Sequence, residues 1–82
     1  MLWPRVTDVQ PLPDYHVQLR FETDEIKILD VKPYIYGEKF EKLLNERYFG
    51  TVHIANGTIE WAGGQDIAPH ELYDLSIPVT EE

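Results

Sequence analysis

The sequence predicts an α+β fold in which a small antiparallel sheet, of about five strands and two hairpins, packs on one main α-helix and a short C-terminal helical turn. Three observations support this prediction. Residues 15–22 alternate between apolar and polar side chains, as a half-buried strand does. Residues 36–48 repeat apolar side chains at helical spacing. Asn56-Gly57 separates two apolar segments and is the strongest short-range signal for a two-residue hairpin turn.

The first three strands are expected in the N-terminal third of the chain. Arg5–Gln10 reads as a short strand that ends at Pro11-Leu12-Pro13, because neither proline can donate a ladder hydrogen bond. The alternation of the next strand places four apolar side chains opposite four polar ones: Tyr15, Val17, Leu19 and Phe21 against His16, Gln18, Arg20 and Glu22. In the segment Glu25–Val31 the apolar side chains change face, so we expect a bulge or the end of pairing near Leu29.

The segment from Gly37 to Phe49 predicts one amphipathic helix. Its apolar side chains, together with the preceding tyrosine, recur at spacings of three and four residues, and acidic and basic residues lie between them. The apolar set is Tyr36, Phe40, Leu43, Leu44 and Tyr48. This helix is expected to cover the sheet.

The hairpin predicted around Asn56-Gly57 fixes its own register. A type I′ turn needs positive φ at both central residues, which asparagine and glycine tolerate. Pairing Ala55 with Thr58 sets Ile54 opposite Ile59 and Val52 opposite Trp61, so the apolar pairs fall on one face. Trp61 is therefore expected in the core.

The C-terminal segment begins with a glycine corner and restarts as a helical turn. Gly63-Gly64 allows a sharp backbone turn, and Pro69 suits the first position of a helix. Asp66 is the side chain expected to cap that helix, while Leu72 and Tyr73 are expected to pack. Residues 76–79 read as a last edge strand or a packed tail, and 79–82 as a frayed end.

Composition limits the classes of function. Eighty-two residues are expected to form a single domain, 1–82, with 43% hydrophobic residues to fill one core. The chain has no cysteine, no apolar run that could span a bilayer and no signal-peptide pattern, so a cytoplasmic location is expected. A net charge of −8 opposes binding to nucleic acid or anionic lipid.

Several segments together resemble a small bacterial family catalogued as domain of unknown function 2442. They are Pro11-Leu12-Pro13-Asp14-Tyr15 before the alternating strand, the predicted helix after Lys32-Pro33-Tyr34, and the run from Gly57 to Tyr73. The most specific part is Gly57-x-Ile59-x-Trp61-x-x-Gly64-x-Asp66-Ile67-x-Pro69-x-x-Leu72-Tyr73. The chain departs from the family pattern at Glu25, Ala62-Gly63 and Ala68.

The resemblance implies an α+β fold with a compact antiparallel sheet and one main helix, and it implies no activity. Relatives occur alone, sometimes encoded beside another small protein in toxin–antitoxin-like pairs, or ahead of a helix-turn-helix domain. No helix-turn-helix follows Glu82, so the DNA-binding variant is not expected here. A protein partner, encoded nearby in the genome, is the expectation that the resemblance favours.

Five residues are candidates for binding, and each has a structural interpretation beside it. Asp66 is either a ligand carboxylate or a helix cap, and Trp61 and Tyr73 either line a pocket or fill the core. His16 and Arg20 lie on a polar strand face that is either a partner-binding surface or simply solvated. His16, His53 and His70 with Asp66 show no metal-ligand spacing, and a nucleophilic triad lacks both a cysteine and a serine elbow. No cofactor or metal is expected.

The sequence thus leaves three classes of function. The first is a non-enzymatic module that binds another protein through a sheet face or edge. The second is a small-molecule sensing domain, which requires a pocket of a few hundred cubic ångströms walled by Trp61, Tyr73 or Tyr36. The third is an enzyme, which requires two titratable side chains, such as those of Asp66 and His70, to converge in a cleft.

Overall fold

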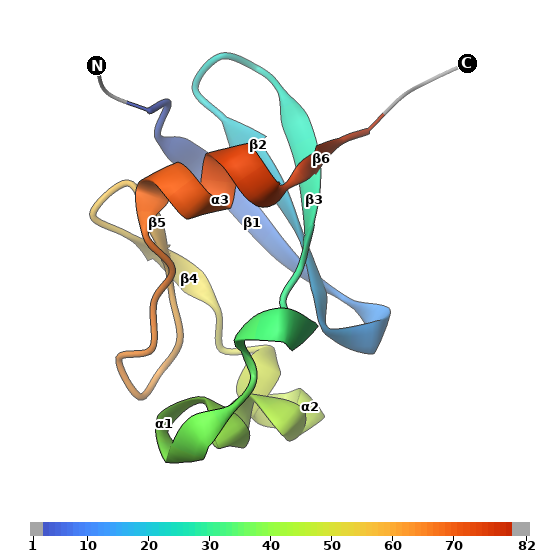
Figure 1. Cartoon of the computed structure of the whole chain (residues 1–82). Helices are drawn as coiled ribbons and strands as arrows, with labels where there is room; N and C mark the ends of the chain where they lie inside the picture. Colours follow the sequence, from blue (N-terminus) through green and yellow to red (C-terminus); the bar gives the residue numbers. More distant parts are fainter. Residues whose placement is uncertain (1–2, 80–82) are drawn as a thin grey trace.

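The computed structural model describes residues 3–79 and contains two antiparallel sheets (Figure 1). The larger sheet has four strands in the order β1 (Val6–Leu12), β2 (His16–Phe21), β3 (Ile26–Asp30) and β6 (Ile77–Pro78). The smaller sheet is the hairpin of β4 (His53–Ala55) and β5 (Thr58–Glu60). The α+β class is confirmed, but the expected single sheet of about five strands is two sheets. The hairpin packs against β1, and one backbone hydrogen bond, from the N–H of Val6 to the Gly57 carbonyl (3.1 Å), joins it to the larger sheet.

The helices are short and occupy two places (Figure 1). α1 (Gly37–Glu41) and α2 (Glu46–Phe49) lie together near the turn between β1 and β2, and α3 (Pro69–Leu75) crosses the four-stranded sheet. Three short 3-10 helices complete the described elements: Pro13–Tyr15, Lys32–Tyr34 and Lys42–Leu44. Within residues 3–79, every helix is too short and too polar to span a bilayer.

The predicted single helix over residues 37–49 is wrong, because Asn45 interrupts it. Asn45 has extended backbone geometry (φ −78°, ψ 120°), and its side-chain oxygen accepts hydrogen bonds from the backbone N–H groups of Arg47 and Tyr48. Asparagine is favoured at helix starts because its side chain satisfies amides that lack an intrahelical partner. Leu43 remains in the core, whereas Leu44 is 52% exposed and Tyr36, which precedes α1 in extended geometry, is 76% exposed.

The strand pattern predicted for β2 is confirmed, and β3 needs a correction. Val17, Leu19 and Phe21 are buried, as the alternation predicts. β3 pairs with β2 in one uninterrupted register, so there is no bulge near Leu29. Its buried side is Lys27 and Leu29, followed by Val31 just beyond the strand, while Ile26 and Ile28 lie on the opposite face.

Lys27 can face the core because its charged end has partners there. Its ammonium group donates to the Tyr73 carbonyl (2.6 Å) and lies 3.8 Å from the centre of the Tyr73 ring. A buried ammonium is tolerated when hydrogen bonds and an aromatic face replace part of its hydration. The sequence pattern, which treats lysine as a surface residue, gives no sign that Lys27 lies on the buried face of this strand.

The first strand is longer than predicted. β1 continues past Gln10 through Pro11 to Leu12, and Pro11 pairs with Val17 of β2. Proline is tolerated here because β1 is an edge strand of the sheet.

The turn and register of the hairpin are confirmed over β4 and β5, but these strands are shorter than predicted and the expected pair of Val52 with Trp61 is not part of them. Ala55 pairs with Thr58 and Ile54 with Ile59, and both turn residues have positive φ (Asn56 55°, Gly57 81°). Trp61 is 1% exposed and its indole N–H donates to the Phe49 carbonyl (2.9 Å), which confirms its place in the core.

The start and end of the C-terminal segment differ in part from the prediction. Pro69 begins α3 as predicted, but the cap position is Ala68 and no side chain caps it, so the expected cap by Asp66 is wrong. Asp66 instead pairs with Glu60 in an isolated β-bridge, which fixes its backbone in the corner before the helix. The tail forms an edge strand, and the N–H of Val79 donates to the Ile26 carbonyl (2.9 Å). The predicted fraying of residues 79–82 is therefore wrong at Val79, and residues 80–82 lie outside the described residues.

Candidate protein-binding surface

The outer face of the four-stranded sheet, opposite α3, is polar on one side and apolar on the other. The register places Gln10, Gln18, Ile28 and Ile77 in one row across the four strands. The polar part contains His16 and Arg20, the two candidates that the sequence places on this face. The apolar part was not predicted. It depends on Ile28 of β3 lying on the outer face and on the tail pairing with β3.

Large apolar side chains gather around β6. Four of the seven exposed large apolar side chains within residues 3–79 lie there: Tyr36 (76% exposed), Leu75 (58%), Ile77 (70%) and Val79 (40%). Together with half-buried Ile28 and the carboxylates of Asp30 and Glu71, we call this area the β6 surface. Isolated exposed apolar residues are normal, but a continuous group of them marks interaction sites.

Two depressions make the β6 surface continuous. A groove of about 400 Å³ lies between the end of β3, the C-terminal end of α3 and Tyr36. A second depression of about 420 Å³ runs along the outer face past His16, Ile28 and Val79. Asp30 and Ile77 line both, so the two depressions meet at these residues.

Both edges of the larger sheet carry a proline. Pro11 lies in edge strand β1 and Pro78 in edge strand β6. Because Val79 donates to β3, the alternation of an antiparallel ladder turns the backbone of Pro78 outward, where it has no N–H to offer. An added strand would find no donor at that position, so this edge is protected from strand pairing. Contact with a partner is therefore expected through side chains.

The polar candidates on the outer face have local partners. The Nδ1 of His16 donates to the Asp14 carbonyl (2.9 Å), since a carbonyl only accepts, and this leaves Nε2 as an acceptor. Arg20 lies 4.0 Å from Asp24 in an ion pair whose side chains are half or more exposed. Such pairs are weak, so Arg20 keeps most of its capacity to bind.

Tyr73 links α3 to the turn between β2 and β3. Its hydroxyl donates to both carboxylate oxygens of Glu25 (2.7 and 2.9 Å), and its ring packs edge-on against Phe21 at 5.1 Å. Hydrogen bonds from Thr23 and then from Tyr73 lower the pKa of Glu25, and the bond to Glu25 raises the pKa of Tyr73. Tyr73 and Glu25 therefore contribute to the packing of α3 against the sheet.

Asp66 and His70 are not brought together by an ion pair in the described part of the chain. Asp66 is exposed. The His70 ring packs at a tilt of 53° against Trp3, with 5.6 Å between ring centres, and the Nε2 atom of His53 lies 3.5 Å from a carboxylate oxygen of Glu60. Across the part of the chain that the structure describes, no group of three or more such side chains is placed to hold a metal ion.

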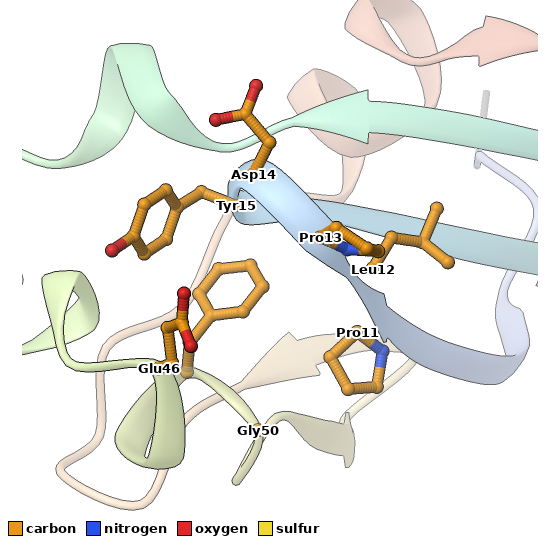
Figure 2. A pocket seen from close by; sticks show the side chains of 8 residues that line it. Pro11, Leu12, Pro13, Asp14, Tyr15, Glu46 and Gly50 are labelled. Carbon is orange, nitrogen blue, oxygen red and sulfur yellow. The ribbon is translucent and has the colours of Figure 1, made fainter.

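A depression of about 310 Å³ lies between the β1–β2 turn and α2 (Figure 2). Asp14 and Tyr15 both have left-handed backbone geometry there (φ 62° and 60°), which is costly for residues other than glycine. The turn directs Asp14 away from Glu46, toward Lys32 (2.7 Å), and the Lys32 hydrogen bond and charge lower the pKa of Asp14.

The aromatic wall of this depression is also used in packing. The Tyr15 hydroxyl donates to the Leu44 carbonyl (2.5 Å), and its ring packs edge-on against Phe49 at 5.5 Å. These contacts join the β1–β2 turn to the helices and offset the strained backbone. We therefore interpret the depression as a packing junction and the β6 surface as the candidate site.

Comparison with known proteins identifies the family. The family described as "Protein of unknown function (DUF2442)" matches residues 6–78. The chain belongs to this family. In this DUF2442 chain the motif between Gly57 and Tyr73 is mostly core and turn, since Ile59, Trp61, Ile67 and Leu72 are at most 2% exposed. A search of curated proteins and a search of solved structures found no match. The DUF2442 description carries no activity, so the surface must indicate the function.

Proposed function

We propose that this chain is a non-enzymatic module that binds another protein, in the cytoplasm, through the β6 surface. The observation that carries this proposal is the gathering of four exposed large apolar side chains at one edge of the sheet. Burying about 100 Å² of such surface contributes about 2.5 kcal/mol to association, before the entropic costs of binding. Solvation alone gives no reason for this grouping.

The partner we propose is a protein encoded by an adjacent gene. This follows the family resemblance, in which relatives are sometimes encoded beside another small protein. The net charge of −8 supports a different, less acidic partner over a second copy of this chain, because two equal negative charges repel each other. The same charge disfavours nucleic acid and anionic membrane surfaces as partners.

The test compares two matched isoleucine variants. Ile77→Ser removes the most exposed aliphatic side chain of the β6 surface, and Ile54→Ser removes a 40% exposed isoleucine on the separate hairpin. Each purified variant is titrated calorimetrically with the products of the adjacent genes. We expect Ile77→Ser to weaken binding about tenfold, which corresponds to about 1.4 kcal/mol, and Ile54→Ser to change it less than about twofold.

Two results would contradict the proposal. One is the absence of a complex between the wild-type chain and any adjacent gene product at micromolar concentration. The other is an equal loss of binding in Ile77→Ser and Ile54→Ser, which would place the interface elsewhere or show that the loss reflects folding. The unfolding midpoint of each variant separates those two explanations.

A small-molecule sensing domain is the second candidate, and the groove beside Tyr36 favours it. Its volume of about 400 Å³ lies within the range of ligand pockets. Its walls, however, include Tyr36 and Leu75, which are 76% and 58% exposed, so the groove encloses a ligand on few sides. A metabolite that raises the unfolding temperature of the wild-type chain, and not of Tyr36→Ala, would favour this candidate. The enzyme alternative has no comparable support.

A further inference from the structure

The groove of the β6 surface combines an apolar floor with negative charge. Leu29, Pro33 and Leu75 supply apolar walls, and Asp30 and Glu71 supply two carboxylates. Among the described residues that line it, none is a lysine, arginine or histidine. A ligand that fits both properties has an apolar stem and a positively charged end.

The carboxylates of Asp30 and Glu71 differ in the hydrogen bonds that they already accept. An oxygen of Asp30 accepts a hydrogen bond from the backbone N–H of Lys32 (3.0 Å). Glu71 is half-buried on α3, and it forms no ion pair or hydrogen bond with any of the side chains that the structure describes. A partly buried carboxylate without a cation nearby retains an electrostatic preference for one, and partial burial reduces screening by salt.

An unpaired hydroxyl lies beside the same carboxylate. The Tyr34 hydroxyl is buried and has no hydrogen-bond partner among the described residues. Tyr34 and Glu71 both line the groove. Burial raises the pKa of Tyr34, and the charge of Glu71 raises it further. Buried hydroxyls in folded proteins are nearly always hydrogen-bonded, so a donor that reached this end of the groove would find an acceptor in the Tyr34 hydroxyl.

Tyr36 completes the requirements for one particular side chain. Its ring is 76% exposed at the entrance of the groove and can stack against a planar cation. The guanidinium group of arginine is planar, pairs with carboxylates through two parallel hydrogen bonds and stacks on aromatic rings, whereas the ammonium group of lysine does only part of this.

We propose that the groove between Tyr36 and Leu75 receives an arginine side chain of the protein partner. The methylene stem lies along the apolar walls, and the guanidinium group pairs with Glu71 and stacks on Tyr36. This inference rests on the proposed protein-binding function and names the partner residue that the β6 surface recognises. Its test uses defined peptides, so it can succeed or fail independently of the choice of partner protein.

The probe is the blocked tripeptide Leu-Arg-Leu, with its citrulline counterpart as the uncharged isostere. Binding to the full ¹⁵N-labelled chain is followed by amide chemical-shift changes at millimolar peptide concentration. We expect the arginine peptide to shift the amides of Tyr36, Glu71 and Leu75 and to bind about five- to tenfold more tightly than the citrulline peptide. Glu71→Gln should remove that difference.

Glu46→Gln is the matched control, because Glu46 is an exposed carboxylate in the other depression (Figure 2). It should leave the preference for arginine unchanged. The proposal is overturned if the two peptides bind equally, if neither binds, or if the shifts lie outside the groove. If the peptides fail while Ile77→Ser still weakens binding to a protein partner, the arginine inference is wrong and the protein-binding function stands.

Discussion

Gly63 and Gly64 have different structural tasks, and an alanine substitution at Gly63 tests this distinction. Gly64 has a left-handed backbone (φ 91°), whereas Gly63 does not need the freedom of glycine for its backbone angles. A Cβ atom at Gly63 would instead overlap the Tyr48 hydroxyl and lie 3.0 Å from the side-chain oxygen of Gln65. That hydroxyl donates to the same oxygen (3.0 Å), and Gln65 is 2% exposed. Alanine therefore displaces the hydroxyl and breaks a largely buried hydrogen bond.

The cost follows from the two effects. Loss of a hydrogen bond to a buried polar group costs about 1–3 kcal/mol, and forcing a well-packed ring aside adds about 1 kcal/mol. We expect Gly63→Ala to lower the free energy of unfolding by about 2–4 kcal/mol. Tyr48→Phe should cost about 1 kcal/mol, and the double variant should cost less than the sum of the two, because phenylalanine lacks the oxygen that overlaps the new methyl group.

Urea denaturation followed by the fluorescence of buried Trp61 measures all three free energies. Gly50→Ala is the control, since Gly50 has φ −70° and its added Cβ would meet backbone oxygens no closer than 3.4 Å. That change should alter stability by less than about 1 kcal/mol, in the stabilising direction if at all. Additive costs in the double variant, or equal costs for Gly63→Ala and Gly50→Ala, would refute the assignment of Gly63 to this contact.

Three further predictions concern stability. Tyr34→Phe should leave the free energy of unfolding unchanged or raise it by about 1 kcal/mol in denaturant titrations, because it removes a buried hydroxyl with no partner in the described chain. A loss of stability above about 1 kcal/mol would show that the hydroxyl has a partner. Asn45→Ala should lower the free energy of unfolding by about 1 kcal/mol, since two backbone amides of α2 lose their cap. Asn45→Asp should retain most of the wild-type stability, and equal losses in the two variants would contradict the capping role. The lowered pKa of Glu25 means that its contribution is present above the ordinary carboxyl pKa and is lost as the pH falls through the lowered value. Urea midpoints measured from pH about 5 to about 3 should therefore fall less steeply for Tyr73→Phe than for wild type, and parallel profiles would contradict this.

The sequence correctly predicts the elements whose conformation depends on residues close together in the chain. The turn at Asn56-Gly57 depends on the backbone preferences of two residues, and the alternation of β2 depends on one buried face. The predicted helix fails at Asn45 because helical spacing of apolar residues says nothing about a side chain that caps a new helix. The burial of Lys27 in β3 could not be predicted, because the groups that stabilise its ammonium there, including Tyr73, come from the other end of the chain.

The sequence predicts the polar half of the candidate surface but not the apolar half, because only the polar half depends on local pattern. The polar side chains of β2, His16 and Arg20, can be placed on an outer face from the strand period alone. The apolar half requires the tail to pair with β3 and the segment before α1 to leave Tyr36 exposed, and both are tertiary events. The available signal was Ile77 and Val79, two apolar residues at strand spacing beside a proline, which is typical of an edge strand with one exposed face.

The position of the β6 surface relative to the family motif has a consequence for other members. The motif from Gly57 to Tyr73 supplies turns, core and the helix start, so a chain that keeps it keeps this corner of the fold. Ile77, Leu75 and Tyr36 lie outside the motif, and Glu71 occupies one of its unspecified positions. Changes at these positions alter the surface at little cost to the core, because their side chains are at least partly exposed. If the β6 surface binds a partner as we propose, members that share the motif are expected to share the fold and to differ in partner, and the residues at the groove positions, rather than the motif, would indicate that difference.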